Sequence, residues 1–436
     1  MNMIGAINSK NMFENIKKVH FIGIGGIGVS ALAKMMLLQK KKATGSDLRV
    51  NIVNQRIKKL GGKVFIGHKK SNLAKDTDVV IYSPAIKDDN PELVEAKKLK
   101  IPTYSYPQAL GLISKEKYTI ALSGTHGKTT TTAMLAEVMI SAKKSPTIII
   151  GSFLRKQKDN FVSGKGKYFV VEACEYKKSF LSINPDILVI TNIDNDHLDY
   201  FKNLKNIQKA FAQLISKVPQ GGFVICNPKD PKIKPVLKSA KAKIVDYTKE
   251  KKLKLKVPGD HNIQNAQAVL AVAKILKIKQ EAEKSLKKYL GVWRRFEYKG
   301  KTKKGALIYD DYAHHPSEVQ ATIKATREKF PKQKIFIIFQ PHLYSRTKLL
   351  LNDFAQSFNQ ADQVIITDIY AAREKDTGLI HAKDLVEEIS KYNPFVFYRS
   401  NFKEIIEYLK ENTSKDDIIM TMGAGDVYEI GEKLIS

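Results

Sequence analysis

The chain has 436 residues, of which 43% are hydrophobic and 27% charged, with 25 glycines and 15 prolines. This composition is typical of a globular protein and excludes disordered, collagen-like and low-complexity chains. At about 100–200 residues per domain, the length predicts about three domains. No apolar run approaches the roughly 18 residues of a membrane span, and residues 1–18 lack the apolar core and cleavage site of a secretory signal. We therefore expect a cytoplasmic protein without a membrane partner.

The formal net charge of +30 is unusually high for such a chain. Its lysines are scattered in short groups and do not form one stripe with interleaved aromatic residues, as a nucleic-acid-binding surface would require. We interpret the charge as a lysine-rich solvated surface, with steering of polyanionic substrates such as nucleotides as the second interpretation. No nucleic-acid partner is expected. The two cysteines, Cys174 and Cys226, are too few for a disulfide framework or a four-ligand zinc site.

Strands alternate with helices along the first segment. Residues 18–23 are expected to form an apolar strand that leads into a glycine-rich turn, and residues 29–39 have the apolar spacing of a helix. Further strands are expected up to residues 45–47 and over residues 78–83. This alternation predicts a parallel, doubly wound, Rossmann-like sheet. Residues 101–117, with two prolines, are interpreted as the linker out of it.

The second segment begins with an expected strand at 118–122, a glycine-containing turn and a helix at 128–141. Further strands are expected at 168–172, 187–191 and 222–227, and further helices at 204–218 and 262–276. The pattern predicts a central parallel sheet of the P-loop ATPase type. The polar and basic residues 291–304 are interpreted as a second linker.

The third segment repeats the alternation. Strands are expected at 306–309, 334–339, 363–367, 395–398 and 417–422, and helices at 316–330 and 350–359. This predicts a second Rossmann-like sheet. The chain is therefore predicted to be an α/β protein of three domains, with boundaries at 1–115, 116–298 and 299–436.

A phosphate-binding loop is indicated by residues 124–129, Gly-Thr-His-Gly-Lys-Thr, which lie between an expected strand and a helix. Glycines let backbone N–H groups approach phosphate oxygens, and a helix N-terminus favours negative charge. Lys128 would neutralise the β- and γ-phosphates of ATP, and the Thr129 hydroxyl would bind Mg²⁺. The common pattern has a further glycine at the position of Leu122. A glycine-rich turn without a ligand is the alternative interpretation.

An earlier glycine-rich turn, residues 23–28, also follows a strand and opens a helix, and Asp47 lies near the end of the next strand. This matches the dinucleotide fingerprint, in which a diphosphate lies at the helix N-terminus and an acidic residue binds a ribose hydroxyl. Any nucleotide diphosphate could use such a loop, so the pattern does not by itself indicate hydride transfer. A purely structural turn is the alternative.

Acidic residues and a histidine follow two apolar strands of the central segment. Glu172 ends one strand, and His197 follows another in Thr-Asn-Ile-Asp-Asn-Asp-His. Because the carboxyl ends of parallel strands meet at one edge of a sheet, both are expected beside the phosphate loop. We interpret Glu172 and His197 as Mg²⁺ ligands, direct or through water, although histidine is an atypical ligand for this ion. Ordinary surface or capping residues are the alternative.

Taken together, eight motifs resemble those of the Mur ligases of peptidoglycan synthesis. They occur in order over nearly the whole chain, at residues 20–28, 124–130, 172–175, 191–197, 259–265, 294–296, 310–316 and 339–347. The resemblance implies a UDP-sugar-binding first domain, a central ATPase and a C-terminal domain that brings in the amino acid. Within the family, the motifs are most similar to those of ligases that join L-alanine to the lactyl carboxylate of UDP-N-acetylmuramate through an acyl phosphate. That implies ATP and Mg²⁺ as cofactors, a role in cell wall biogenesis, cell shape and cell division, and a monomer or weak dimer.

The resemblance also assigns site residues in all three domains. The implied UDP-sugar-binding residues are Gly25, Gly26, Asp47 and Ser83. The implied ATP-binding residues are Gly124, Thr125, His126, Gly127, Lys128, Thr129, Thr130, Asn262, Asn265 and Asp311. Tyr312, His342 and Arg346 would bind the amino acid. The implied catalytic residues are Lys128, Glu172, His197 and Arg295, with Thr129, Glu172 and His197 as metal ligands.

Simpler roles remain open for some of these residues, and two positions depart from the family pattern. Asn262 and Asn265 could cap a helix, and His342 could be a structural histidine; His197 and His342 are the candidates for deprotonating the alanine ammonium. Leu343 occupies a position where the alanine-adding ligases of this family often have an arginine. The leucine removes a second contact to the alanine carboxylate at this position. Tyr106 also replaces a frequent arginine.

Three other functions are weighed against alanine ligation. A sister ligase that attaches the recycled tripeptide L-Ala-γ-D-Glu-diaminopimelate to UDP-N-acetylmuramate is the nearest, but residues 342–347 resemble the alanine-adding pattern. An NAD-dependent oxidoreductase would use the first glycine-rich turn and leave the phosphate loop without a role. A nucleic-acid-binding ATPase, suggested by the charge, is the third.

Overall fold

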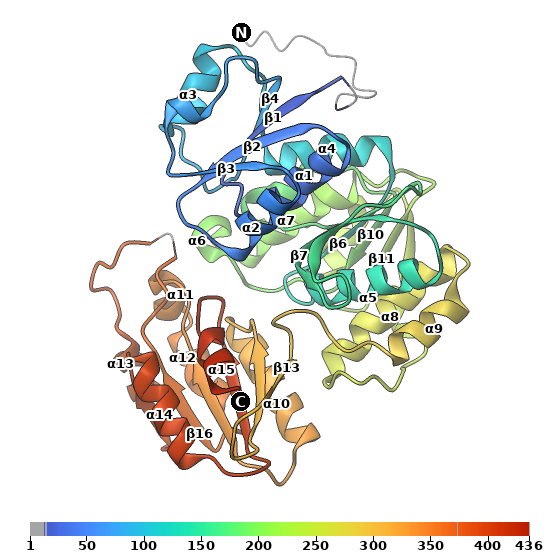
Figure 1. Cartoon of the computed structure of the whole chain (residues 1–436). Coiled ribbons are helices and arrows are strands. Elements are labelled where there is room, and N and C mark those ends of the chain that lie inside the picture. The colour runs from blue at the N-terminus through green and yellow to red at the C-terminus, as the bar shows by residue number, and fades with distance from the viewer. Residues whose placement is uncertain (1–12, 14, 373, 436) are drawn as a thin grey trace. The chain divides into compact units, whose positions relative to one another are not determined.

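The computed structural model describes residue 13, residues 15–372 and residues 374–435. These residues form three sheets of five, seven and six strands (Figure 1), so the predicted three-domain α/β architecture is confirmed. They separate into two compact units: the first runs to Leu253 and includes Gln264–Leu286, and the second comprises Lys254–Ile263 and the chain from Lys287 onward. None of the helices in the described ranges has the length and apolar character needed to cross a membrane. Residues 1–18, for which we expect no signal sequence, lie mostly outside the described residues. The domain boundaries at 115 and 298 stay predictions.

The first sheet has the Rossmann strand order β3-β2-β1-β4-β5, and all its strands are parallel. Its strands are β1 (Lys18–Ile22), β2 (Lys42–Asp47), β3 (Lys63–Ile66), β4 (Val79–Tyr82) and β5 (Thr103–Ser105). Its helices are α1 (Ile27–Leu38), α2 (Ile52–Lys59), α3 (Pro91–Lys98) and α4 (Tyr106–Glu116), with the 3₁₀ turn η1 (Lys70–Asn72). The strand order reverses at β1, where ligands of doubly wound sheets bind beyond the carboxyl ends of the strands.

The interpretation of residues 101–117 as a linker is wrong. Residues Thr103–Ser105 form the edge strand β5, and Tyr106–Glu116 form α4. Pro107 lies in the first turn of α4, where a missing N–H costs nothing, and Ser105 with Gln108 forms a capping box. Pro102 therefore precedes a strand and Pro107 marks the start of a helix, and neither interrupts the domain.

The second sheet has the order β12-β11-β10-β6-β9-β7-β8, parallel except for the β7–β8 hairpin. Its strands are β6 (Tyr118–Ser123), β7 (Thr147–Leu154), β8 (Asp159–Val162), β9 (Tyr168–Glu172), β10 (Ile187–Ile190), β11 (Phe223–Cys226) and β12 (Lys243–Asp246). The helices are α5 (Lys128–Ser141), α6 (Leu198–Phe201), α7 (Leu204–Ile215), α8 (Asp260–Ile275) and α9 (Lys279–Lys287), with 3₁₀ segments η2 (Tyr176–Ser182), η3 (Lys234–Ser239) and η4 (Tyr247–Lys249). Because β6 lies between β9 and β10, the turn after β6 is adjacent to the carboxyl ends of both neighbours.

The third sheet has the order β13-β14-β18-β15-β16-β17. Its strands are β13 (Glu297–Lys301), β14 (Leu307–Asp311), β15 (Ile335–Phe339), β16 (Gln363–Ile366), β17 (Val396–Tyr398) and β18 (Ile418–Met422). The helices are α10 (Pro316–Lys329), α11 (Tyr344–Leu349), α12 (Leu351–Ala355), α13 (Ala382–Ser390), α14 (Phe402–Asn412) and α15 (Tyr428–Leu434), with the 3₁₀ turn η5 (Gln356–Phe358). Apolar clusters cover both faces of this sheet, as a doubly wound architecture requires.

The second predicted linker, residues 291–304, is also corrected by the structure. Glu297–Lys301 forms strand β13, which pairs antiparallel with β14 at the edge of the third sheet. None of its residues is fully buried. An edge strand of this kind carries no apolar alternation, so its sequence looks like that of a polar connection.

Candidate active site

The turn between β6 and α5 has a backbone that requires its glycines. Gly124 has a φ of +134° and Gly127 a φ of +79°, both in the region that favours glycine. A Cβ on Gly124 would collide with Thr191 Oγ1, so the residue that follows the neighbouring strand β10 packs directly against the turn. Leu122 is completely buried inside β6. The glycine of the common pattern is absent because the strand continues through that position and the turn starts at Gly124.

Lys128, the first residue of α5, folds back over this turn. Its Nζ donates to the carbonyl oxygens of Gly124 at 2.6 Å and Thr125 at 2.9 Å, and it lies 2.9 Å from a carboxylate oxygen of Glu175. Burial lowers the pKa of Lys128, but the charge of Glu175 and nearby Glu172 outweighs burial, so the net pKa is raised. Lys128 is therefore a fixed cation in the phosphate loop.

Thr129 and Glu172 are brought together as predicted from the strand ends. The Thr129 hydroxyl donates to Glu172 Oε1 at 2.8 Å, and the backbone N–H of Gly151 on β7 donates to Glu172 Oε2 at 2.8 Å. A hydroxyl and a carboxylate placed next to a phosphate loop are hard oxygen donors of the kind Mg²⁺ prefers.

His197 lies next to acidic residues to which the sequence pattern assigned no role. Its Nε2 is 3.6 Å from Asp196 Oδ2 and 4.0 Å from Glu175 Oε1. One potential ligand atom from each of the three residues lies within 4.8 Å of the other two. Because Glu175 also pairs with Lys128, this cluster is continuous with the phosphate loop.

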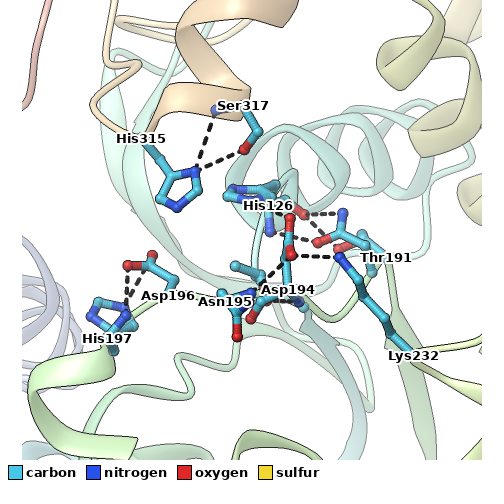
Figure 2. A network of polar contacts seen from close by, with 12 residues as sticks. His126, Thr191, Asp194, Asn195, Asp196, His197, Lys232, His315 and Ser317 are labelled. Atoms are coloured by element: carbon cyan, nitrogen blue, oxygen red, sulfur yellow. Dashed lines mark hydrogen bonds and ion pairs between the residues drawn. The ribbon is translucent and has the colours of Figure 1, made fainter. Parts of the chain in front are cut away.

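Asp194 is another residue of the loop after β10 to which the sequence pattern assigned no role. Figure 2 shows its carboxylate between His126 and Lys232, with Lys232 Nζ at 2.6 Å and His126 Nε2 at 3.8 Å. The interaction with His126 and the lysine hold the pKa of Asp194 well below its usual range, against the effect of burial. The backbone N–H of Asp194 also donates to Thr125 Oγ1 at 2.8 Å. The loop after β10 therefore braces the phosphate loop, and the position of Asp194 after a strand was the signal that could have identified it.

The two asparagines of α8 differ in their surroundings. A Cβ on Gly127 would lie 2.7 Å from Asn265 Oδ1, which places the Asn265 amide directly against the phosphate loop. Asn262 donates from Nδ2 to the carbonyl oxygen of Pro258 at 2.6 Å and so braces the turn that opens its helix.

The predicted sugar-nucleotide residues gather at one edge of the first sheet. Gly25 and Gly26 follow β1, Asp47 ends β2 and Ser83 follows β4, and these three strands are neighbours. The backbone N–H of Gly25 donates to Asp47 Oδ2 at 2.8 Å. A Cβ on Gly23 would lie 3.0 Å from the Cβ of Ser83.

Three further side chains, not assigned from the sequence, line this turn. A Cβ on Gly25 would lie 2.6 Å from Asn54 Oδ1 and 2.7 Å from Asn51 Nδ2. A Cβ on Gly28 would lie 2.6 Å from the ring of Tyr106. Tyr106, which replaces a frequent arginine, therefore packs its ring on the first turn of α1 and contributes contact area at a place where an arginine would contribute charge.

In the second unit, the adjacent arginines 294 and 295 have different roles. The buried guanidinium of Arg294 bonds to Asp310 at 2.9 Å and to the carbonyl oxygens of Gly423 and Gly425. Arg295 lies 5.0 Å from the centre of the Tyr312 ring. Arg294 thus braces the fold, and Arg295 belongs to the group of predicted ligand residues.

Asp311 is held by the backbone at the end of β14. Its carboxylate accepts from the N–H groups of Phe296 at 2.7 Å and Ala313 at 2.8 Å. Burial raises the pKa of Asp311 to about 6, while the charge of Arg295 and the two backbone bonds oppose that shift. A carboxylate oriented in this way can accept hydrogen bonds from hydroxyl groups.

The predicted amino-acid residues also lie in one group. Arg346 Nη1 donates to His342 Nδ1 at 3.1 Å, and the His342 ring stacks on Tyr370 with centroids 5.9 Å apart. The His314 ring lies between those of Tyr312 and His342, with centroid distances of 5.4 and 5.7 Å. His314, which was not assigned from the sequence, therefore connects two predicted residues.

The structure accounts for the leucine at position 343, which departs from the family pattern. It adopts a φ of +71° and is only 3% exposed. An apolar side chain at this buried position cannot bind a carboxylate, so Arg346 supplies the cation next to His342.

Models of Mur ligase domains match three stretches of the chain. The Mur ligase family catalytic domain matches residues 18–118, the Mur ligase middle domain residues 122–254, and the Mur ligase glutamate ligase domain residues 294–425. The first and third of these stretches contain every strand of the first and third sheets, and the middle stretch contains the second sheet except for most of β6.

Individual relatives extend this similarity over nearly the full length. A UDP-N-acetylmuramate–L-alanine ligase of Caldanaerobacter subterraneus subsp. tengcongensis is 44% identical, with 97% of this chain and 98% of the relative covered. The crystal structure of a UDP-N-acetylmuramate–alanine ligase from Thermotoga maritima matches with a TM-score of 0.80 at 28% identity, covering 96% of this chain and 98% of the other. A murein peptide ligase from Psychrobacter arcticus shares the fold, with a TM-score of 0.70 at 23% identity and coverage of 96% and 98%.

Proposed function

The chain belongs to the Mur ligase family, and from this premise we propose that it joins L-alanine to the lactyl carboxylate of UDP-N-acetylmuramate while ATP is converted to ADP and phosphate. The observation that carries the proposal is the phosphate loop, where Lys128 meets Glu175 and Thr129 meets Glu172, in a chain 44% identical to a ligase of that name. The product is a precursor of peptidoglycan. We place the enzyme in the cytoplasm as a monomer or weak dimer.

The first step makes the carboxylate reactive. A lactyl carboxylate oxygen forms a bond to the γ-phosphorus, the bond from that phosphorus to the β–γ bridging oxygen breaks, and ADP leaves. Lys128 neutralises charge on the transferring phosphoryl group, and the family resemblance implies that Arg295 supplies a further cation. This step needs positioning and charge neutralisation more than covalent chemistry.

Mg²⁺ fits the donor set beside Lys128. We propose that Thr129 and Glu172, which already share a hydrogen bond, hold the ion together with His197, directly or through water. When bound, Mg²⁺ would supply positive charge that offsets the negative charge of the ATP phosphates. Carboxylate and hydroxyl oxygens suit this hard cation, and Asp196 and Glu175 supply more of them around His197.

The second step forms the amide. The ammonium of L-alanine first gives up one proton to solvent, the resulting free amine attacks the acyl carbon, and the tetrahedral intermediate expels phosphate, which takes up the second proton from the nitrogen. His342 is a poor acceptor for that proton, because Arg346 donates to its Nδ1 and the neutral ring then carries its hydrogen on Nε2. We therefore propose that His342 orients alanine by donating a hydrogen bond from Nε2. Arg346 would pair with the alanine carboxylate, with Tyr312 beside them.

The other predicted residues hold the two nucleotides. Gly25 and Gly26 would present backbone N–H groups to the diphosphate of the sugar nucleotide, with Asp47 and Ser83 beside them. Asn265 and Asn262 would contact the adenine or ribose of ATP, and Asp311 would accept from the ribose hydroxyls.

The proposal is tested by measuring phosphate release from ATP and Mg²⁺ with UDP-N-acetylmuramate and a panel of acceptors. The panel contains L-alanine, glycine, L-serine and the tripeptide L-Ala-γ-D-Glu-diaminopimelate. L-alanine is expected to give the highest kcat/KM and a UDP-sugar product whose mass has increased by one alanine residue. Turnover with the tripeptide but not with alanine would overturn the choice within the family, and joining without ATP would overturn the mechanism.

A further inference from the structure

A buried lysine on α1 has no role in the function proposed above. Lys34 is only 1% exposed, although its helix belongs to the first sheet and is otherwise packed with apolar residues. Its Nζ donates to Asp159 Oδ1 at 2.5 Å and to Asn160 Oδ1 at 2.7 Å. Both partners lie at the start of β8, in the hairpin of the second sheet. A lysine is almost never buried to this extent unless it is paired.

The same hairpin also holds the first turn of α1. The Asn160 side-chain amide donates to the Ser30 hydroxyl at 3.0 Å and to the carbonyl oxygen of Ile27. Ile27 is the first residue of α1 and directly follows Gly26 of the sugar-nucleotide turn. The hydrogen bonds of Asn160 therefore lie within one helical turn of the expected diphosphate.

A second anchor joins α2 to the hairpin. The Arg56 guanidinium lies 4.4 Å from the centre of the Phe153 ring, and its Nη1 donates to the carbonyl oxygen of Lys158 at 2.6 Å. These contacts lie near the tip of the hairpin, next to Asp159. The hairpin thus contacts α1 and α2, the helices that follow two of the three strands carrying the sugar-nucleotide residues.

At its other end the hairpin touches the predicted metal ligand. Gly151 on β7 donates its backbone N–H to Glu172, which in turn accepts from Thr129 of the phosphate loop. A Cβ on Gly151 would lie 2.9 Å from Glu172 Oε2, so the strand lies close against that carboxylate. One strand and its hairpin therefore contact the ATP site at Glu172 and the sugar-nucleotide helix at Lys34.

We propose that Lys34, Asp159 and Asn160 are positioning residues that set the distance between the two nucleotide sites. The inference rests on the proposed function, in which a carboxylate of one nucleotide substrate must approach the γ-phosphate of the other. A hydrogen-bonded polar network around a buried cation selects one geometry, whereas an apolar contact tolerates sliding. A misplacement of about 1 Å in such an approach can cost about 100-fold in rate.

The test compares Lys34→Met with the wild-type enzyme. Methionine keeps most of the length of the side chain and removes the charge and the donors. The kcat for phosphate release with UDP-N-acetylmuramate and L-alanine is expected to fall about 10- to 100-fold, while dissociation constants for ATP and for UDP-N-acetylmuramate, measured by calorimetry, change less than about threefold. A merely structural lysine would not separate kcat from both affinities in this way.

Three further variants complete the test. Asp159→Asn keeps an acceptor oxygen for Lys34 and is expected to retain more activity than Asp159→Ala. Asn160→Ala removes the bonds to α1 while Lys34 keeps its ion pair with Asp159, so it replaces Lys34→Met should that variant not fold. Lys324→Met, which removes only an exposed pair with Glu328 on α10, is the matched control and should keep the wild-type kcat.

The results separate this inference from the function on which it rests. Wild-type kcat in the folded Lys34→Met, Asp159→Ala and Asn160→Ala variants would overturn the positioning role and leave the ligase intact. The positioning role is also overturned if the affinities fall as much as kcat, or if only the melting temperature falls. Absence of alanine ligation in the wild-type enzyme would instead overturn the proposed function.

Discussion

The two glycine-rich turns of the first unit have similar sequences and a similar place between a strand and a helix, but different surroundings. The turn after β1 leads into Ile27, and its Gly25 N–H donates to the Asp47 carboxylate. The turn after β6 leads into Lys128, which is paired with Glu175. A backbone cradle with a carboxylate suits a diphosphate and ribose that stay unchanged, whereas a transferring phosphoryl group needs a cation. In the proposed function, the first residue of the helix therefore distinguishes the turn that binds the sugar nucleotide from the turn at which ATP reacts.

The largest effect is expected for Lys128→Ala, which tests whether the two turns serve different substrates. We expect turnover to fall by more than about 1000-fold, because the cation that neutralises the transferring phosphoryl group is lost. UDP-N-acetylmuramate should still bind with an affinity close to that of the wild type, since its turn is a separate one. Phosphate release and calorimetry measure the two effects, with Lys324→Ala as the control; loss of both turnover and sugar-nucleotide binding would mean that the two turns are assigned to the wrong substrates.

The next largest effect is expected for Glu172→Gln. The amide keeps the size of the side chain but loses the charge that accepts from Thr129 and would bind the metal. We expect kcat to fall about 100-fold and the Mg²⁺ concentration for half-maximal rate to rise about tenfold. Titration of phosphate release with Mg²⁺ measures both, and Glu328→Gln on the exposed face of α10 serves as the control. An unchanged Mg²⁺ dependence would contradict the assignment of Glu172 as a ligand.

A smaller and selective effect is expected for Gly25→Ala. The new Cβ would meet the side-chain ends of Asn54, Asn51 and Asp47 at 2.6–2.8 Å. These flexible groups can shift, so we expect the KM for UDP-N-acetylmuramate to rise about tenfold, equivalent to about 1.4 kcal/mol, with little change in the KM for ATP. Gly221→Ala is a suitable control, because a Cβ there would meet nothing within 4 Å. A rise in the KM for ATP alone would contradict the division of labour between the turns.

The smallest effect concerns Asp311, which serves neither turn directly. Because burial raises its pKa to about 6, the carboxyl takes up a proton as the pH falls from 7 to 5, and it then loses acceptor capacity for ribose hydroxyls. The KM for ATP should rise about two- to fivefold over that range, equivalent to about 0.5–1 kcal/mol for one hydrogen bond, while Asp311→Asn should have a raised KM without this pH dependence. A pH dependence that persists in Asp311→Asn would assign the titration to another group.

The raised pKa of Asp311 also makes the stability of the fold depend on pH. A carboxyl whose pKa is higher in the folded than in the unfolded protein binds more protons when folded. Asp311 therefore makes the fold less stable as the pH rises from about 4 to about 6. Thermal unfolding of the wild type and Asp311→Asn over this range measures the difference.

Most strands and the sites at their ends could be predicted because local patterns encode them. The meeting of Thr129 with Glu172 follows from a strand end beside a glycine turn, and the sugar-nucleotide residues gather for the same reason. The two predicted linkers were wrong because prolines at a helix start and a polar edge strand look like connections in a sequence. Asp194 and Glu175 also follow strand ends, but they were missed because only the path of each loop decides what a side chain there touches.

The sequence by itself determined the α/β class, most of the strands and the loop that carries Lys128, because hydrophobic periodicity and glycine backbone freedom are local properties. The tertiary structure alone decided that Lys128 pairs with Glu175 and that Lys34 meets Asp159, a partner 125 residues away. Such pairs form when packing removes water from groups that are distant in the chain, and no spacing within the sequence records which groups will meet.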